Sequence, residues 1–129
     1  MAEESALLQD TPEVEIGGRK YKLRRLRTED VFAVSRMMTR ALSNAGLNLM
    51  ALGDLVGGFR VIAGLLTDDL ADWYASLLGV KPSEFREMPP EAAPTVLEAL
   101  ERHPDYRAFL ANVYRHLELL GSVLVRPLT

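Results

Sequence analysis

The sequence predicts a mainly α fold: a single compact domain of about five helices with a short N-terminal β-hairpin. Apolar residues recur at the helical period over most of the chain after residue 28. Capping residues open these segments, and glycine or proline closes them. Before them, apolar and charged residues alternate around Gly17-Gly18, as they do in two paired strands. A chain of 129 residues is long enough for one domain with its own core.

The predicted organisation is a tail followed by one domain. We expect residues 1–11 to form a flexible acidic tail. Residues 12–129 then form a single helical domain, with the hairpin over 12–26 and the helices over 28–120. The start of the chain, MAEESALLQD, is acidic where a secretory signal is basic and then apolar, so we expect no targeting segment.

The stretch EVEIGGRKYKL predicts the hairpin. Gly17 and Gly18 supply the two positive-φ residues that a type I′ turn needs. Such a turn sets the cross-strand pairs Ile16 with Arg19, Glu15 with Lys20, Val14 with Tyr21 and Glu13 with Lys22. One face then carries apolar side chains and the other carries opposite charges. A two-stranded hairpin is marginal alone, so we expect its apolar face to pack on the helices.

Thr28 is predicted to open the first helix as its N-cap. Glu29 and Asp30 follow in the first turn, where the helix dipole favours acids. Gly46 is the expected end of the helix. The predicted buried stripe consists of Val31, Val34, Met38, Ala41, Leu42 and Ala45.

The run LNLMALGDLVGGFRVIAGLL, residues 47–66, is predicted to be the second helix. Its only charges are Asp54 and Arg60. A membrane span needs about 20 residues, which the run has, but each charge near its middle costs about 3 kcal/mol. We therefore expect a helix packed in a small helical domain. The sequence leaves open whether that helix is continuous through Gly57-Gly58.

Three more helices and a short helical turn complete the predicted fold. A third helix is capped by Thr67 and ends at Gly79, and the turn lies within VKPSEFREMPP. The fourth helix starts within 90–94, because Pro94 is tolerated only near a helix start. It runs to about residue 102, and the fifth helix covers about 105–120.

No catalytic or metal-binding motif is visible in the sequence. The absence of cysteine excludes disulfides and thiolate metal sites. His103 and His116 have no second ligand at a useful spacing, so we expect them to be surface histidines near helix ends. Asp68, Asp69 and Asp72 are explained as early acids of a helix rather than as a magnesium site. We therefore expect a protein that is not an enzyme and uses no cofactor or metal.

The stretch RKYKLRRLR is the strongest charge feature. Its six cations form a charged docking face in the prediction: Arg19, Lys20, Lys22, Arg24, Arg25 and Arg27. They suit a nucleic-acid patch with Tyr21 stacking on bases, a solvated hairpin, or docking on the acidic surface of another copy. The net charge of -3 and a pI of about 5.4 are unlike those of a typical nucleic-acid-binding domain. We expect no nucleic-acid partner.

Several motifs resemble those of one protein family. A strand KYKLRRL leads into a helix that starts TEDVFAVSRM, an apolar middle follows, and a long helical segment begins LADWYASLLGVKPSEFREMPP. The matching elements are Asp30-Val31-Phe32, residues 77–80, Ser83-Glu84-Phe85, Met88-Pro89 and residues 105–109. Over residues 20–118, the chain resembles the tail assembly chaperones of long-tailed bacteriophages and prophages. Gly57-Gly58 and Pro94 depart from the family pattern.

The resemblance implies a non-enzymatic role in phage assembly. Such chaperones bind the tape measure protein, keep it soluble and assist assembly of the tail tube. The implied partners are the tape measure protein, further copies of the chain as a homo-oligomer, and the tail tube protein, with no membrane involved. The implied location is the cytoplasm of the host bacterium, and the protein is not expected in the mature virion.

A chaperone of this kind needs apolar surface, and flexible methionines adapt to varied partners. The predicted partner and self-association surface consists of Met37, Met38, Met50, Leu55, Phe59, Val61 and Ile62. The same residues also suit an ordinary core. Two other functions stay open: a structural phage subunit such as a connector or tail completion protein, and a small nucleic-acid-binding regulator that uses residues 19–27.

Overall fold

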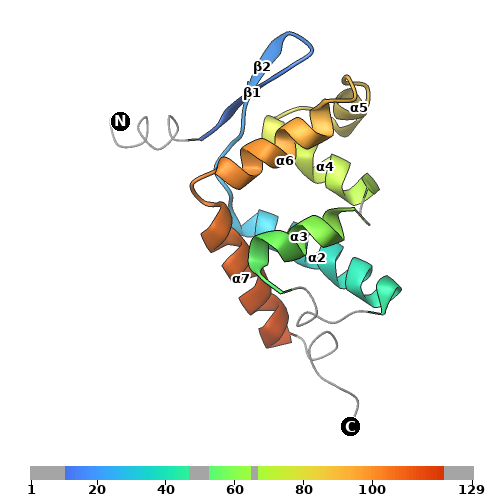
Figure 1. Ribbon diagram of the computed structural model, residues 1–129, viewed down its shortest axis with the longest axis vertical. Coiled ribbons are helices and arrows are strands. Elements are labelled where there is room, and N and C mark those ends of the chain that lie inside the picture. The colour runs from blue at the N-terminus through green and yellow to red at the C-terminus, as the bar shows by residue number, and fades with distance from the viewer. Residues whose placement is uncertain (1–10, 47–52, 65–66, 121–129) are drawn as a thin grey trace. The chain divides into compact units, whose positions relative to one another are not determined.

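The computed structural model describes residues 11–46, 53–64 and 67–120 and is shown in Figure 1. Within them the chain forms a two-stranded antiparallel sheet and six helices, which confirms the mainly α fold class with an N-terminal hairpin. The elements are β1 (Glu13–Ile16), β2 (Arg19–Lys22), α2 (Thr28–Ala45), α3 (Leu55–Ala63), α4 (Thr67–Leu78), α5 (Pro82–Arg86), α6 (Ala92–Arg102) and α7 (Tyr106–Leu120).

The described chain divides into two compact units, each made of segments that are distant in sequence. The first comprises residues 11–26 and 71–106, and the second comprises residues 27–46, 53–64, 67–70 and 107–120. The hairpin, most of α4, α5 and α6 belong to the first unit, and α2, α3 and nearly all of α7 belong to the second. The single domain predicted over 12–129 stays a prediction.

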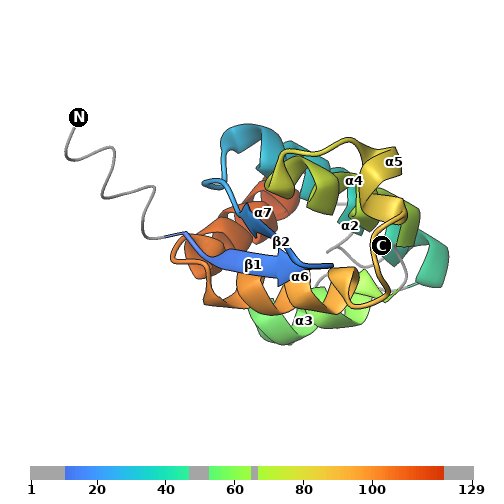
Figure 2. The same ribbon diagram turned by 90° about the horizontal axis from the view of Figure 1, so that it is seen from above.

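The hairpin has the predicted register and turn. Its four cross-strand pairs run from Glu13 with Lys22 to Ile16 with Arg19. Gly17 and Gly18 have φ angles of 59° and 81°, a region that side chains other than glycine rarely adopt. The apolar face is buried, and β1 packs on α6, as Figure 2 shows. Of the predicted tail only Thr11 lies among the described residues, and it is buried rather than free.

Aromatic side chains from α4 and α5 are part of the core of the first unit. Trp73 and Tyr74 are buried on α4, and the Tyr74 ring meets Phe85 of α5 edge to face with centroids 5.9 Å apart. Burial, with a smaller contribution from Glu101, raises the pKa of Tyr74 above its ordinary value. Pro94 lies in the first turn of α6, where its missing N–H removes no helical hydrogen bond, so the predicted start of this helix is confirmed.

Helix α2 begins and ends close to the predicted residues, but its cap differs. Thr28 is the first helical residue rather than the cap. The carboxylate of Asp30 accepts a hydrogen bond from the backbone N–H of Arg27 at 2.7 Å and so closes the first turn. Asp30 is buried, with 1% of its surface exposed, whereas Thr28 is exposed. Gly46 ends the helix with a φ of 71°, as predicted.

The helix predicted over 47–66 is wrong at its start. Residues 47–52 and 65–66 lie outside the described part of the chain, but Gly53 and Asp54 precede α3 and are not helical. Asp54 is its N-cap, and its Oδ1 accepts a hydrogen bond from the Gly57 N–H at 2.7 Å. A Cβ on Gly57 would lie 3.0 Å from the other oxygen of that carboxylate. The glycine therefore makes room for the cap, and α3 is continuous through Gly57-Gly58.

The start of α3 also contacts α7. The Tyr114 hydroxyl donates a hydrogen bond to the carbonyl oxygen of Leu55 at 3.4 Å. Burial of the phenol, and then the nearby Asp54 carboxylate, raise the pKa of Tyr114 to about 12. The hydroxyl therefore keeps its proton, and can donate this bond, throughout the neutral pH range. Within the described residues, no helix combines the length and apolar character that a bilayer span requires.

The cap of α3 gives the first testable prediction. The change Asp54→Ala should lower the free energy of unfolding by about 1 kcal/mol, because the Gly57 N–H loses its acceptor. Urea unfolding followed by circular dichroism measures the change. The control is Glu98→Ala, an exposed site on α6, which should shift stability by less than about 0.5 kcal/mol. Equal effects of the two substitutions would contradict the cap.

Candidate protein-binding groove

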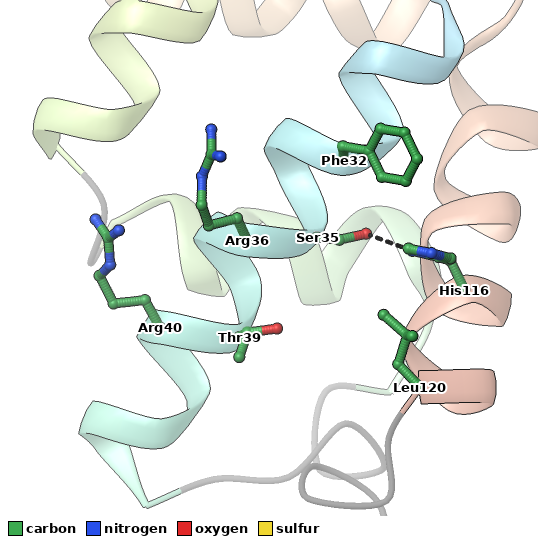
Figure 3. Close-up of a pocket in the computed structure, with 7 residues that line it drawn as sticks. All are labelled: Phe32, Ser35, Arg36, Thr39, Arg40, His116 and Leu120. Carbon is green, nitrogen blue, oxygen red and sulfur yellow. Dashed lines mark hydrogen bonds between the residues drawn. The ribbon is translucent and has the colours of Figure 1, made fainter.

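An open groove runs between α2 and α7 in the second unit. Its cavity volume is about 410 Å³. Figure 3 shows the side chains that line it: Phe32, Ser35, Arg36, Thr39, Arg40, His116 and Leu120. The α2 residues fall at positions 32, 35–36 and 39–40, about one helical turn apart, and the two α7 residues lie four positions apart, so each set shares one helix face. The groove is therefore formed by two helix faces that meet in space.

The apolar part of the groove is unusually exposed. Phe32 has 57% of its surface exposed and Leu120 has 67%, although both are large apolar side chains. Single exposed apolar residues need no explanation, but two that line the same hollow mark a surface that suits a partner.

Phe32 is held against α7 by His116. Their ring centroids are 5.5 Å apart in an edge-to-face arrangement. The Ser35 hydroxyl lies 3.5 Å from Nδ1 of the same imidazole, which is long for a hydrogen bond. Phe32 and Ser35 both point from α2 toward α7 in Figure 3. These contacts join the α2 side of the groove to its α7 side.

The charged side chains that line the groove are both cations. Arg40 Nη1 pairs with Asp69 Oδ2 of α4 at 2.7 Å. Arg36, one turn earlier on α2, is exposed and makes no ion pair with the described residues. Among the described residues, no acidic side chain lines the groove, although the chain as a whole has a net charge of -3. The groove therefore combines apolar surface with local positive charge.

The partner surface predicted from the sequence is largely interior. Met37, Met38, Phe59 and Ile62 are all buried, with at most 4% of their surface exposed. Their helical spacing, which suggested one apolar face, is the spacing of the face that α2 and α3 turn inward. Of the rest, Val61 is 58% exposed, Leu55 is half-buried and Met50 lies outside the described residues. The surface role is thus corrected for the four buried residues.

The six predicted cations do not act alike. Arg19, Lys20 and Lys22 are exposed on the hairpin. Arg24 instead bonds within the fold: Nε and Nη1 donate to the carbonyl oxygens of Ser76 and Arg25, and Nη2 donates to Ser76 Oγ at 2.7 Å. Arg25 Nη2 pairs with Asp105 Oδ1 at 2.7 Å, and Arg27 pairs with Glu29 at 3.1 Å. These three arginines form intramolecular contacts. Of the predicted face, only the hairpin cations Arg19, Lys20 and Lys22 remain as an exposed charged surface.

His103 is buried, with 4% of its surface exposed, so its predicted surface position is wrong. Its Nδ1 accepts a hydrogen bond from the Asp105 N–H at 3.0 Å. The proton of the neutral ring is then on Nε2, which lies 2.9 Å from the Arg24 carbonyl oxygen and donates to it. Asp105 also accepts from the Leu26 N–H at 3.4 Å. The segment after the hairpin is thereby bonded to the loop between α6 and α7.

Two of the three carboxylates that the sequence explained as early acids of a helix have cationic neighbours. Asp69 pairs with Arg40, and Asp72 pairs with Arg86 at 3.0 Å. Within the described residues, no group of three or more histidine, aspartate or glutamate side chains is arranged to hold a metal ion. The acids early in α4 therefore stand in ion pairs and near a helix start, where the dipole favours them.

Arg25 provides the test of a structural role for the cations. The change Arg25→Ala should reduce the free energy of unfolding by about 1 kcal/mol, because the pair with Asp105 is only partly exposed. The matched control Arg19→Ala removes an exposed hairpin cation and should leave stability within about 0.5 kcal/mol. Urea midpoints of the purified variants measure both. Loss of stability in Arg19→Ala alone would show that the assignment is reversed.

Comparison with known proteins adds no relative. No protein-family model matches the chain, and searches of curated proteins and of solved structures find no significant match either.

Proposed function

We propose that the chain is a tail assembly chaperone of long-tailed phages, a non-enzymatic protein that binds the tape measure protein and keeps it soluble while the tail tube assembles. The proposal rests on the resemblance of residues 20–118 to that family. The structural observation that supports it most is the α2–α7 groove, in which Phe32 is more than half exposed.

A groove between two helices suits a helical client. Amphipathic helices bind such grooves by placing side chains at positions i, i+3, i+4 and i+7 against apolar walls. Phe32 offers an aromatic anchor and Leu120 an aliphatic one, and both are exposed. Long apolar helices of the kind that a tape measure protein contains would be covered in this way and kept from aggregating.

The remainder of the chain suits a protein that stays soluble around such a client. The net charge is -3, and ion pairs such as Arg27–Glu29 are exposed. We propose that the protein works in the cytoplasm of the host bacterium, that several copies associate along one client, and that it leaves before the virion is complete. The tail tube protein is a further proposed partner.

The test is coexpression with the tape measure protein encoded in the same genome. We expect the wild type to keep that protein soluble and to copurify with it. The change Phe32→Ser should reduce the copurified amount about tenfold, since loss of a central aromatic anchor costs about 1.4 kcal/mol or more. The control Val61→Ser removes an apolar side chain of similar exposure from α3 and should have little effect.

Two results would contradict the proposal in different ways. If the wild type neither solubilises nor copurifies with the tape measure protein, the chaperone function is wrong. If antibodies detect the chain in purified virions, it is a structural subunit of the particle instead. If Val61→Ser abolishes copurification and Phe32→Ser does not, the function stands and the assigned surface is wrong.

A further inference from the structure

The charged side chains around the groove say more about the chemistry of its partner than the apolar side chains do. Arg36 and Arg40 lie one turn apart on α2, so their side chains flank the same stretch of the groove. Asp69 already neutralises Arg40 at 2.7 Å. Arg36 is exposed and has no ion-pair partner in the described part of the chain. The groove thus holds one compensated cation and one that is open to a ligand.

The complement of this surface is a helix with a carboxylate beside its apolar stripe. The apolar stripe would cover Phe32 and Leu120, and the carboxylate would reach Arg36 in a charge-assisted, bidentate pair. Ser35 and Thr39 lie between these regions and suit small side chains or the polar edge of the stripe. A helix with lysine or arginine at the same position would face a cation, which disfavours it strongly.

A nucleic acid fits the groove less well than a helix does. Polyanions bind through a series of cations that each neutralise a phosphate. Here the lining offers Arg36 and an Arg40 that is paired with Asp69, and most of the remaining surface is apolar. Charge complementarity therefore favours a single carboxylate on an otherwise apolar helix.

We propose that the α2–α7 groove selects amphipathic helices that carry an acidic residue next to their apolar stripe, and that Arg36 recognises this residue by pairing with its carboxylate. The inference rests on the proposed function in taking a helical protein segment as the occupant. It goes further in naming the chemistry by which this chaperone distinguishes the segments of a client that it covers from those that it leaves free.

The experiment uses two synthetic helical peptides that differ only in one charge. Both carry leucines at i, i+3, i+4 and i+7, and the flanking residue beside the stripe is glutamate in one and lysine in the other. Fluorescence anisotropy with the full chain gives the two dissociation constants. We expect the wild type to bind the glutamate peptide about tenfold more tightly than the lysine peptide.

Variants of Arg36 test the assignment directly. The change Arg36→Glu should reverse the preference between the peptides, and Arg36→Gln should remove it. Phe32→Ser should weaken the binding of both peptides. Because Arg36 is exposed and unpaired among the described residues, these variants should keep the circular dichroism spectrum of the wild type. The matched control Arg107→Glu makes the same charge change at an exposed site on α7 outside the groove lining and should keep the wild-type preference.

Several outcomes would overturn the inference. Equal binding of the two peptides to the wild type, no binding of either, or an unchanged preference in Arg36→Glu would each show that Arg36 does not read charge. Displacement of the glutamate peptide by oligo-dT at equal concentration would identify a polyanion site instead. Because the peptides replace the client, a failure of tape measure solubilisation with an intact peptide preference would reject the function and not the groove.

Discussion

The buried stripe of α2 determines which side chains the second unit presents to a partner. Val34, Met38 and Leu42 are spaced four residues apart, and each is fully buried. Burying such a side chain contributes about 1.5–3 kcal/mol, so together they fix the rotation of the helix about its axis. Once the rotation is fixed, the opposite face, with Phe32 and Arg36, must lie outside. The groove is thus a consequence of core packing. Its apolar and charged composition depends on the residues two positions away from the buried ones, because these face the opposite side of α2.

Features that depend on neighbours in sequence were predictable. The hairpin register follows from two adjacent glycines and a two-residue alternation, which are both local. The start of α6 follows from the restriction that Pro94 places on a helix interior. The start of α3 was not predictable from composition, because an aspartate inside an apolar run is equally consistent with a charge on a long helix. Only the bond from Gly57 to Asp54 shows that it is a cap.

The candidate site was predicted less well, for a physical reason. Core and interface have the same apolar composition. The sequence therefore did not distinguish a core position from an interface position for Met38 and Phe59, whereas their burial does. A signal for the groove did exist in the sequence. Phe32 falls on the face of α2 that carries Arg36 and Arg40, so it is an aromatic residue on a polar face, which a core does not explain. The arginines that follow the hairpin misled in the opposite direction, because Arg24 and Arg25 make contacts within the fold instead of presenting charge to a partner.

The central claim is that a client lies against the α2–α7 groove, and site-specific photocrosslinking in cells tests it most directly. A photoreactive phenylalanine analogue would replace Phe32 in one variant and the exposed Ala111 of α7 in another, with the tape measure protein coexpressed. We predict a crosslinked product from position 32 and little or none from position 111. Copurification of the two proteins without a crosslink from position 32, or equal crosslinks from both positions, would contradict the claim.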